Sequence, residues 1–167
     1  MKGAIGNAFI LNLVITFMLI FFSLLIGSMA YSKAYKTKNY LINLIDKYIT
    51  AGKNDFWNSD SENGKEWDTE VNEYLGKIGY IISDKKNSCP DKNDSTNPYE
   101  GYYIFKNTNY GYDYCIYRKR NTLENSSLMV SKTNYMVLVY MKFDLPVIGD
   151  YIKIPITGET KSYNILR

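Results

Sequence analysis

The chain begins with an uncharged stretch that is long enough to cross a membrane. Residues 8–30 contain no lysine, arginine, aspartate or glutamate. In an α-helix that rises about 1.5 Å per residue, this stretch spans about 35 Å, more than the roughly 30 Å hydrocarbon core of a bilayer. The apolar core of a cleaved signal peptide has only about 7–15 residues. The length therefore predicts a retained tail and transmembrane segment in residues 1–30, and the alternative is a secreted domain cleaved after Ala30.

Small and weakly polar residues interrupt this stretch at helical spacing. At about 100° per residue they fall within an arc of about 100°, opposite larger apolar residues such as Leu11, Val14 and Met18. This small-polar stripe consists of Ala8, Asn12, Thr16, Ser23, Gly27, Ala30 and Ala34. Small side chains let helices approach closely in lipid, and polar ones can form hydrogen bonds between helices. We therefore predict a lateral helix-packing face, and the alternative is a chance distribution on a simple anchor.

The helical pattern continues beyond the apolar stretch. Apolar residues between 31 and 49 largely keep helical spacing, and no proline or glycine occurs between residues 28 and 51. Gly52 is a typical residue at the end of a helix. The sequence thus predicts one long helix from about residue 5 to residue 50. Its half over residues 31–50 is expected to lie on a folded domain that comprises residues 31–167.

The lysines and the cysteines give opposite indications of the side of the membrane on which this domain lies. Lys33, Lys36 and Lys38 follow the apolar stretch while only Lys2 and the amino terminus precede it, which favours a cytoplasmic domain. A potential disulfide and the export-like start favour the opposite side. We predict that the chain is a single-pass protein of the cell membrane and that its C-terminal domain is extracytoplasmic.

The remainder of the chain predicts an α+β domain. Residues 65–78 have the apolar spacing of a second helix, and residues 102–166 read as an antiparallel sheet. Five strands are expected, over residues 102–107, 112–119, 133–143, 151–157 and 160–166. The first two and the last two strands are each expected to pair as a hairpin, the second hairpin turning at Gly158-Glu159. Pro155 predicts an edge strand or a bulge, because proline cannot donate a hydrogen bond to a neighbour.

The two cysteines, Cys89 and Cys115, lie far apart and form no metal-binding motif. In an exported domain the simpler interpretation is a disulfide, and the alternative is two buried thiols. A bridge over a loop of about 25 residues typically contributes about 3 kcal/mol to the free energy of unfolding.

Composition argues against several classes of function. The chain has 17 tyrosines and no histidine, so it lacks the usual general base and the commonest zinc ligand. Its net charge of +3 is near balance and no nucleic-acid-binding motif is present. Residues 91–100 are rich in oxygen ligands but lack the spacing of a calcium loop. We therefore expect no enzymatic activity, no cofactor, no metal site and no nucleic-acid partner.

The tyrosine-rich residues 101–120 allow two interpretations. Tyrosines that alternate along strands usually form cross-strand pairs on a half-buried sheet. Alternatively, Tyr112 and Tyr114 form a candidate ligand face on which a sugar or base could stack.

The layout as a whole supports a family resemblance. A short tail precedes a hydrophobic helix with an amphipathic continuation, and an antiparallel sheet with a disulfide-capable loop follows, ending in FDLPVIGDYIKIPITGETKSY over residues 143–163. This layout resembles the type IV pilin-like class, and in particular the TadE-like minor pilins (pseudopilins) of tight-adherence pilus systems. Pilins usually carry a glutamate five residues after the glycine at which their leader is cut. At that offset Leu11 follows Gly6 and Ala8 follows Gly3, so the chain departs from the family there.

The resemblance implies a non-enzymatic structural subunit of a membrane-anchored pilus or secretion apparatus. Its partners would be other pilin-like subunits or copies of itself, contacted through the N-terminal helix. The alternative is a monomeric, membrane-anchored extracellular module that binds a sugar, a peptide or a cell-wall ligand through the tyrosine-rich hairpin.

Overall fold

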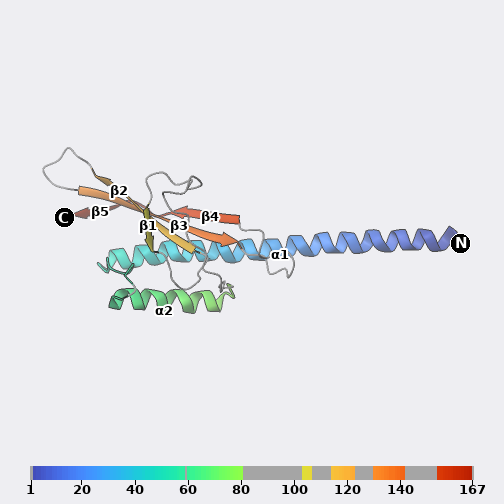
Figure 1. Ribbon diagram of the computed structural model, residues 1–167, viewed down its shortest axis with the longest axis horizontal. Helices are drawn as coiled ribbons and strands as arrows, with labels where there is room; N and C mark the ends of the chain where they lie inside the picture. Colours follow the sequence, from blue (N-terminus) through green and yellow to red (C-terminus); the bar gives the residue numbers. More distant parts are fainter. Residues whose placement is uncertain are drawn as a thin grey trace.

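The computed structural model describes residues 2–58, 60–80, 103–106, 114–122, 130–141 and 154–166. They form an α+β structure in which a long N-terminal apolar helix runs past an antiparallel sheet (Figure 1). This confirms the α+β class, whereas the pilin-like assignment stays a prediction. The helices are α1 (Lys2–Thr50) and α2 (Glu62–Lys77). The strands are β1 (Tyr103–Lys106), β2 (Tyr114–Thr122), β3 (Val130–Met141), β4 (Ile154–Glu159) and β5 (Tyr163–Leu166).

Helix α1 is continuous from the apolar stretch into the folded domain, as the sequence predicts. Its C-terminal end is fixed by Gly52, whose φ of 75° suits a residue without a β-carbon. The Gly52 N–H donates to the Ile49 carbonyl and the Lys53 N–H to the Tyr48 carbonyl, each over 3.0 Å. This pair of bonds is the Schellman motif, which satisfies carbonyl groups of the last turn.

Helix α2 returns along the domain half of α1, on the side away from the sheet (Figure 1). Ser61 caps its N-terminus, since its hydroxyl accepts a 3.0 Å hydrogen bond from the Gly64 N–H. The predicted second helix is therefore present, and it begins three residues before the expected residue 65. The rings of Tyr40 on α1 and Tyr74 on α2 stack with centroids 3.6 Å apart, which places the two helices in direct contact.

The centre of the sheet is β3, which pairs with β2 along one edge and with both β4 and β5 along the other. β5 pairs with the first residues of β3 and β4 with its last residues, and both run antiparallel to β3. The predicted hairpin between the last two strands is therefore wrong: β4 and β5 follow one another along the same edge instead of pairing together. Among the described strands β4 pairs only with β3, so Pro155 lies on an edge strand as predicted.

A bulge at Thr160 separates β4 from β5. The register with β3 shifts by one residue between the Met136–Glu159 pair and the Thr133–Tyr163 pair. Within the bulge, the Thr160 N–H donates to the Tyr135 carbonyl over 2.8 Å. The Tyr135 N–H in turn donates to Thr160 Oγ1 over 3.1 Å, so a side-chain oxygen replaces a backbone acceptor of the ladder. The bulge keeps the last strand on the edge of β3.

The hydrophobic core lies between the sheet and the two helices. Side chains alternate along β2 and β3, and one set faces α1. This set consists of Tyr114, Ile116, Tyr135, Val137, Val139 and Met141. The other set, Cys115, Tyr117, Met136 and Leu138, is buried on the opposite face. Both faces of the central strands are thus removed from water.

Candidate functional site

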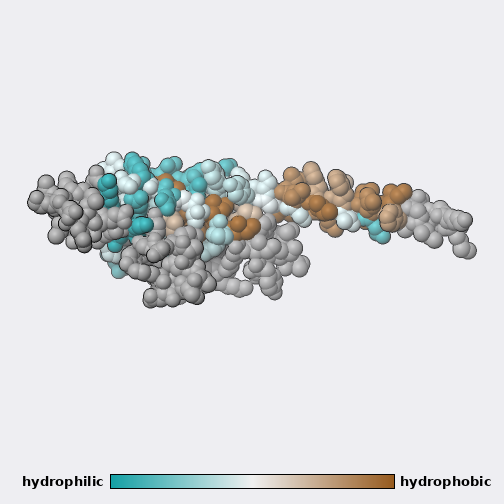
Figure 2. All heavy atoms as spheres, turned by 90° about the horizontal axis from the view of Figure 1, so that it is seen from above, coloured by the Kyte–Doolittle hydropathy of each residue, from teal (hydrophilic) through white to brown (hydrophobic). Residues whose placement is uncertain are grey.

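The half of α1 that precedes the domain is a bare apolar rod. Its large side chains are exposed, from 69% at Phe9 to 44% at Leu25. In Figure 2 hydrophobic surface runs along this half of the helix, whereas the coloured surface of the folded domain is mostly hydrophilic in this view. By length and composition α1 could cross a membrane once, which is compatible with a single-pass anchor. This exposed apolar surface is the feature that most requires a functional explanation.

Polar side chains within this rod differ in how their hydrogen-bonding groups are satisfied. Thr16 Oγ1 donates to the Asn12 carbonyl over 2.9 Å, and Ser23 Oγ donates to the Leu19 carbonyl over 2.8 Å. Such bonds to the preceding turn let hydroxyl groups enter lipid at low cost. The Asn12 carboxamide is exposed and has no hydrogen-bond partner among the described residues. Among the described side chains in this half of α1, this carboxamide would gain most from a partner helix.

The structure divides the small-polar stripe into two parts. Ala30 and Ala34 are buried in the core of the chain's own domain, with Ala34 at 0% exposure. The prediction that these two residues pack laterally against another helix is therefore wrong, because their small side chains serve packing within the domain. Asn12, Thr16 and Ser23 remain exposed, and Gly27 is half-buried. The side chain of Ala8 lies outside the described residues.

The face that carries the stripe continues along α1 as the face that packs on the domain. Beyond Ala34 the buried residues Thr37, Leu41, Leu44 and Tyr48 follow at spacings of three and four. Thr37 is accommodated in this apolar row because its hydroxyl donates to the Lys33 carbonyl over 3.0 Å. The exposed part of the stripe thus lies in line with the core of the domain, a relationship that the sequence pattern alone did not indicate.

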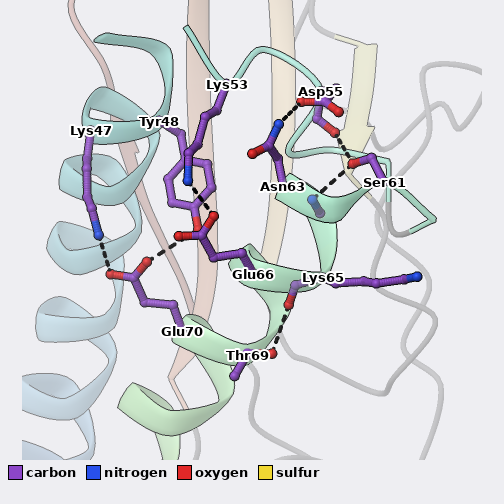
Figure 3. Close-up of polar contacts among 11 residues, drawn as sticks. Lys47, Tyr48, Lys53, Asp55, Ser61, Asn63, Lys65, Glu66, Thr69 and Glu70 are labelled. Carbon is purple, nitrogen blue, oxygen red and sulfur yellow. Dashed lines mark hydrogen bonds and ion pairs between the residues drawn. The ribbon is translucent and has the colours of Figure 1, made fainter. Parts of the chain in front are cut away.

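Polar contacts hold the distal end of α1 against α2 (Figure 3). Lys47 Nζ lies 2.8 Å from Glu70 Oε1, and Lys53 forms an ion pair with Glu66. The Tyr48 hydroxyl donates to Glu70 Oε2 over 3.4 Å. Burial, followed by the nearby Glu66 and Glu70 carboxylates, raises the pKa of Tyr48 well above its ordinary value. The hydroxyl therefore remains a donor throughout the neutral range.

Hydrogen bonds join the loop before α2 to the start of that helix. Asn63 Nδ2 donates to Asp55 Oδ1 over 2.6 Å, and the Ser61 hydroxyl donates to the Asp55 carbonyl over 3.0 Å (Figure 3). The hydrogen bond from Asn63 is the main cause that lowers the pKa of the Asp55 carboxyl. These contacts fix the turn between the two helices.

A second set of polar contacts joins α1 to the edge of the sheet. Lys161 Nζ lies 2.9 Å from Asp46 Oδ1, and the Tyr163 hydroxyl donates to the same oxygen over 2.8 Å. The hydrogen bonds from Lys161 and then Tyr163 lower the pKa of the Asp46 carboxyl. Burial and the Asp46 carboxylate raise the pKa of Tyr163. Composition and periodicity gave no signal for this cluster, because its members are distant in sequence.

Gly158 allows β4 to lie close to α1. A β-carbon at this position would lie 2.7 Å from Cδ1 of Ile42 and 2.8 Å from Cδ of Lys38, which is closer than real contacts allow. The sequence suggests a turn at this glycine, whereas the structure uses it for a close approach of strand and helix. With contacts to the sheet and to α2, the domain half of α1 is held on two sides (Figure 1).

The structure gives little support to the alternative of a ligand face at Tyr112 and Tyr114. Tyr114 is fully buried in the core that faces α1, so its ring is not available to stack on a ligand. Tyr112 lies outside the described residues. In the described part of the chain, no group of three or more histidine, cysteine, aspartate or glutamate side chains could hold a metal ion.

The predicted disulfide remains a prediction. Cys115 is buried on β2, on the sheet face away from α1, and Cys89 lies outside the described residues. Alkylation before and after reduction, read by mass spectrometry, distinguishes a bridge from two thiols.

Comparison of the chain with protein-family models, curated proteins and solved structures finds no match. Function is therefore inferred from the chain's own geometry.

Proposed function

We propose that this protein is a non-enzymatic structural subunit of a membrane-anchored pilus or secretion apparatus, of the minor-pilin or pseudopilin kind. It is anchored by the first half of α1 and assembles through that half with other pilin-like subunits or with copies of itself. Its domain lies on the extracytoplasmic side.

One observation carries this proposal: the exposed half of α1 combines an apolar surface with the unpartnered Asn12 carboxamide. Contact with lipid is sufficient to cover a purely apolar helix surface. A carboxamide in hydrocarbon leaves its donor and acceptor groups unsatisfied, which disfavours an isolated helix. An amide on a neighbouring helix can satisfy these groups, and the small residues nearby let that helix approach.

The continuity of α1 supports an assembly role over a simple tether. The helix passes from the apolar half into the domain without a break, and the domain half is fixed by both the sheet and α2. A neighbour that packs on the apolar half therefore also sets the position of the domain. A flexible linker would not couple the two in this way.

The alternative of a monomeric binding module has less support. That hypothesis depends on the tyrosine-rich hairpin, and Tyr114 faces the core instead of the surface. The packing of both sheet faces leaves no exposed aromatic platform on the described residues of β2 and β3.

The test is co-purification of the tagged full-length chain from its native membrane in mild detergent. We expect Asn12→Leu combined with Gly27→Leu to reduce co-purification of partner subunits, and Asn12→Leu alone to reduce it in the same direction. The conservative pair Met18→Leu and Leu25→Met, on the opposite side of the helix, serves as the control. Unchanged association of both stripe variants, with the domain still folded by circular dichroism, contradicts the proposal.

A further inference from the structure

Where α1 leaves its apolar half, the helix carries a group of aromatic and basic side chains. The junction segment, residues 31–38, contains Tyr31, Lys33, Tyr35, Lys36 and Lys38. It follows directly on the uncharged stretch that ends at Ala30. Seven steps of about 1.5 Å give the segment a length of about 10 Å along the helix. Each headgroup layer of a bilayer is roughly 5–8 Å thick, so the segment is long enough to cross one layer.

The two tyrosines of the junction segment face solvent. Tyr31 is 52% exposed and Tyr35 is 44% exposed, and their rings stack with centroids 6.1 Å apart. Neither ring belongs to the core of the domain. Aromatic side chains that are apolar in the ring and polar at the tip are enriched at the level of lipid headgroups. Two such rings one turn apart suit the level at which a bilayer would end.

The lysines of the segment form no ion pair with an acidic side chain among the residues that the structure describes, and one of them, Lys38, lies over a tyrosine ring. Lys36 is exposed, and Lys38 Nζ lies 4.2 Å from the centre of the Tyr35 ring. Lys33 Nζ donates to the Gly79 carbonyl over 3.0 Å, and this neutral acceptor does not cancel its charge. In the sequence the first acidic residue is Asp46, which lies two turns beyond Lys38. The segment is therefore purely cationic along α1.

The described residues of α2 and β4 do not reverse this charge. Glu73 is the last acidic residue of α2, and its carboxylate is already paired with Lys77 at 2.6 Å. On β4, the first residue is Ile154, an exposed apolar side chain at the end of the sheet that lies toward the bare half of α1 (Figure 1). An apolar residue there is compatible with contact with a membrane surface.

From these observations we infer that the junction segment binds anionic phospholipid headgroups, with Lys36 and Lys38 contacting the phosphate groups and Tyr31 and Tyr35 lying among them. This inference rests on the proposed membrane anchoring. It adds a lipid preference that anchoring by an apolar helix does not require. Each basic residue near an anionic surface favours binding, and the attraction is weakened by salt.

The experiment uses the full-length chain in nanodiscs made of phosphatidylcholine and phosphatidylglycerol. Native mass spectrometry then compares the ratio of the two lipids retained on the protein with their ratio in the bilayer. We expect phosphatidylglycerol to be enriched about fivefold for each contacting lysine at low salt. The variant Lys36→Gln with Lys38→Gln should lose most of this enrichment. The control, Lys65→Gln with Lys132→Gln, removes the same charge from exposed sites on α2 and β3 and should keep it.

The outcomes distinguish the lipid inference from the proposed membrane anchoring. A chain that enters nanodiscs but retains both lipids in the bilayer ratio overturns the lipid inference and leaves the anchor intact. Equal loss of enrichment in the control also overturns it, because net charge alone would then explain the preference. A chain that does not enter nanodiscs at all overturns the proposed anchoring, and the lipid inference with it.

Discussion

The Tyr163 hydroxyl on β5 donates a 2.8 Å hydrogen bond to Asp46 Oδ1 on α1, and Lys161 Nζ lies 2.9 Å from the same oxygen. One carboxylate oxygen thus connects the edge of the sheet to the helix that enters the apolar rod. The contact crosses 117 residues of sequence. It is one of the links through which a force on α1 would reach the sheet.

Removing either partner of this contact should destabilise the domain modestly. For Asp46→Asn and Tyr163→Phe, a double-mutant cycle should give a coupling free energy of about 0.5–1 kcal/mol. The value is small because the Asp46 side chain is 39% exposed and water screens the interaction. Urea unfolding of the full-length chain in detergent measures the cycle. Strictly additive effects of the two substitutions would contradict the contact.

The same carboxylate should make stability depend on pH in the acid range. The pKa of Asp46 is lowered by folding, chiefly through Lys161, so its contribution is present above the unfolded pKa of about 3.9. The contribution is lost as the pH falls through the lower pKa of the folded state. Between about pH 5 and pH 3, the wild-type chain should therefore lose more free energy of unfolding than Asp46→Asn. Parallel curves for the two proteins over this range would show that Asp46 has no lowered pKa.

Substitutions at Gly158 test whether this glycine is required for the close packing of β4 on α1. Gly158→Ala places a β-carbon against Ile42 and Lys38, and Gly158→Val places more atoms there. We expect destabilisation that increases from alanine to valine, reaching about 1–3 kcal/mol. Gly76→Ala is the matched control because its β-carbon meets nothing within 4 Å, and it should be neutral or slightly stabilising. If Gly158→Val unfolds at the same denaturant concentration as wild type, the close approach of β4 and α1 is wrong.

Thr160→Val should disrupt the bulge that joins β4 to β5. Valine keeps the shape of threonine but removes the oxygen that accepts from the Tyr135 N–H. Because Thr160 is buried, an unsatisfied backbone donor should cost about 1–3 kcal/mol. Thr157→Val, at an exposed position of β4, is the control and should change the free energy of unfolding by less than about 0.5 kcal/mol. Equal effects of the two substitutions would argue against a specific role for the Thr160 hydroxyl.

Sequence pattern predicted the helices well because their signals are local. The uncharged stretch, the amphipathic continuation and Gly52 each act within a few turns, and together they account for α1 from Lys2 to Thr50. The second helix was predicted from the same spacing. Its place beside α1 was not, since that depends on contacts such as the stacking of Tyr40 on Tyr74 across 34 residues.

Local sequence pattern does not predict which strands pair at the sheet edge or which strand face lies toward the helix. Two strands that flank a glycine have the same alternation whether they pair with each other or share one neighbour. The sequence therefore predicts a hairpin where the structure has β4 and β5 side by side with β3. The sequence also leaves Tyr114 open to an exposed ligand face, because alternation does not reveal which side of a strand is buried when both sides are. The small-polar stripe was found from sequence, but the assignment of Ala30 and Ala34 to the domain core required the fold.

The central claim is that the exposed part of the small-polar stripe contacts another protein helix within the membrane. Site-specific photo-crosslinking of the full-length chain in its native membrane tests this most directly. A photo-reactive amino acid is placed at Asn12, Thr16 or Ser23, and for comparison at Met18, Phe21 or Leu25 on the remaining surface of the helix. All six side chains are exposed, so accessibility alone does not distinguish the two groups. We expect protein adducts mainly from the three stripe positions. Adducts in equal yield from all six positions, or from none, would show that the stripe does not contact another protein helix.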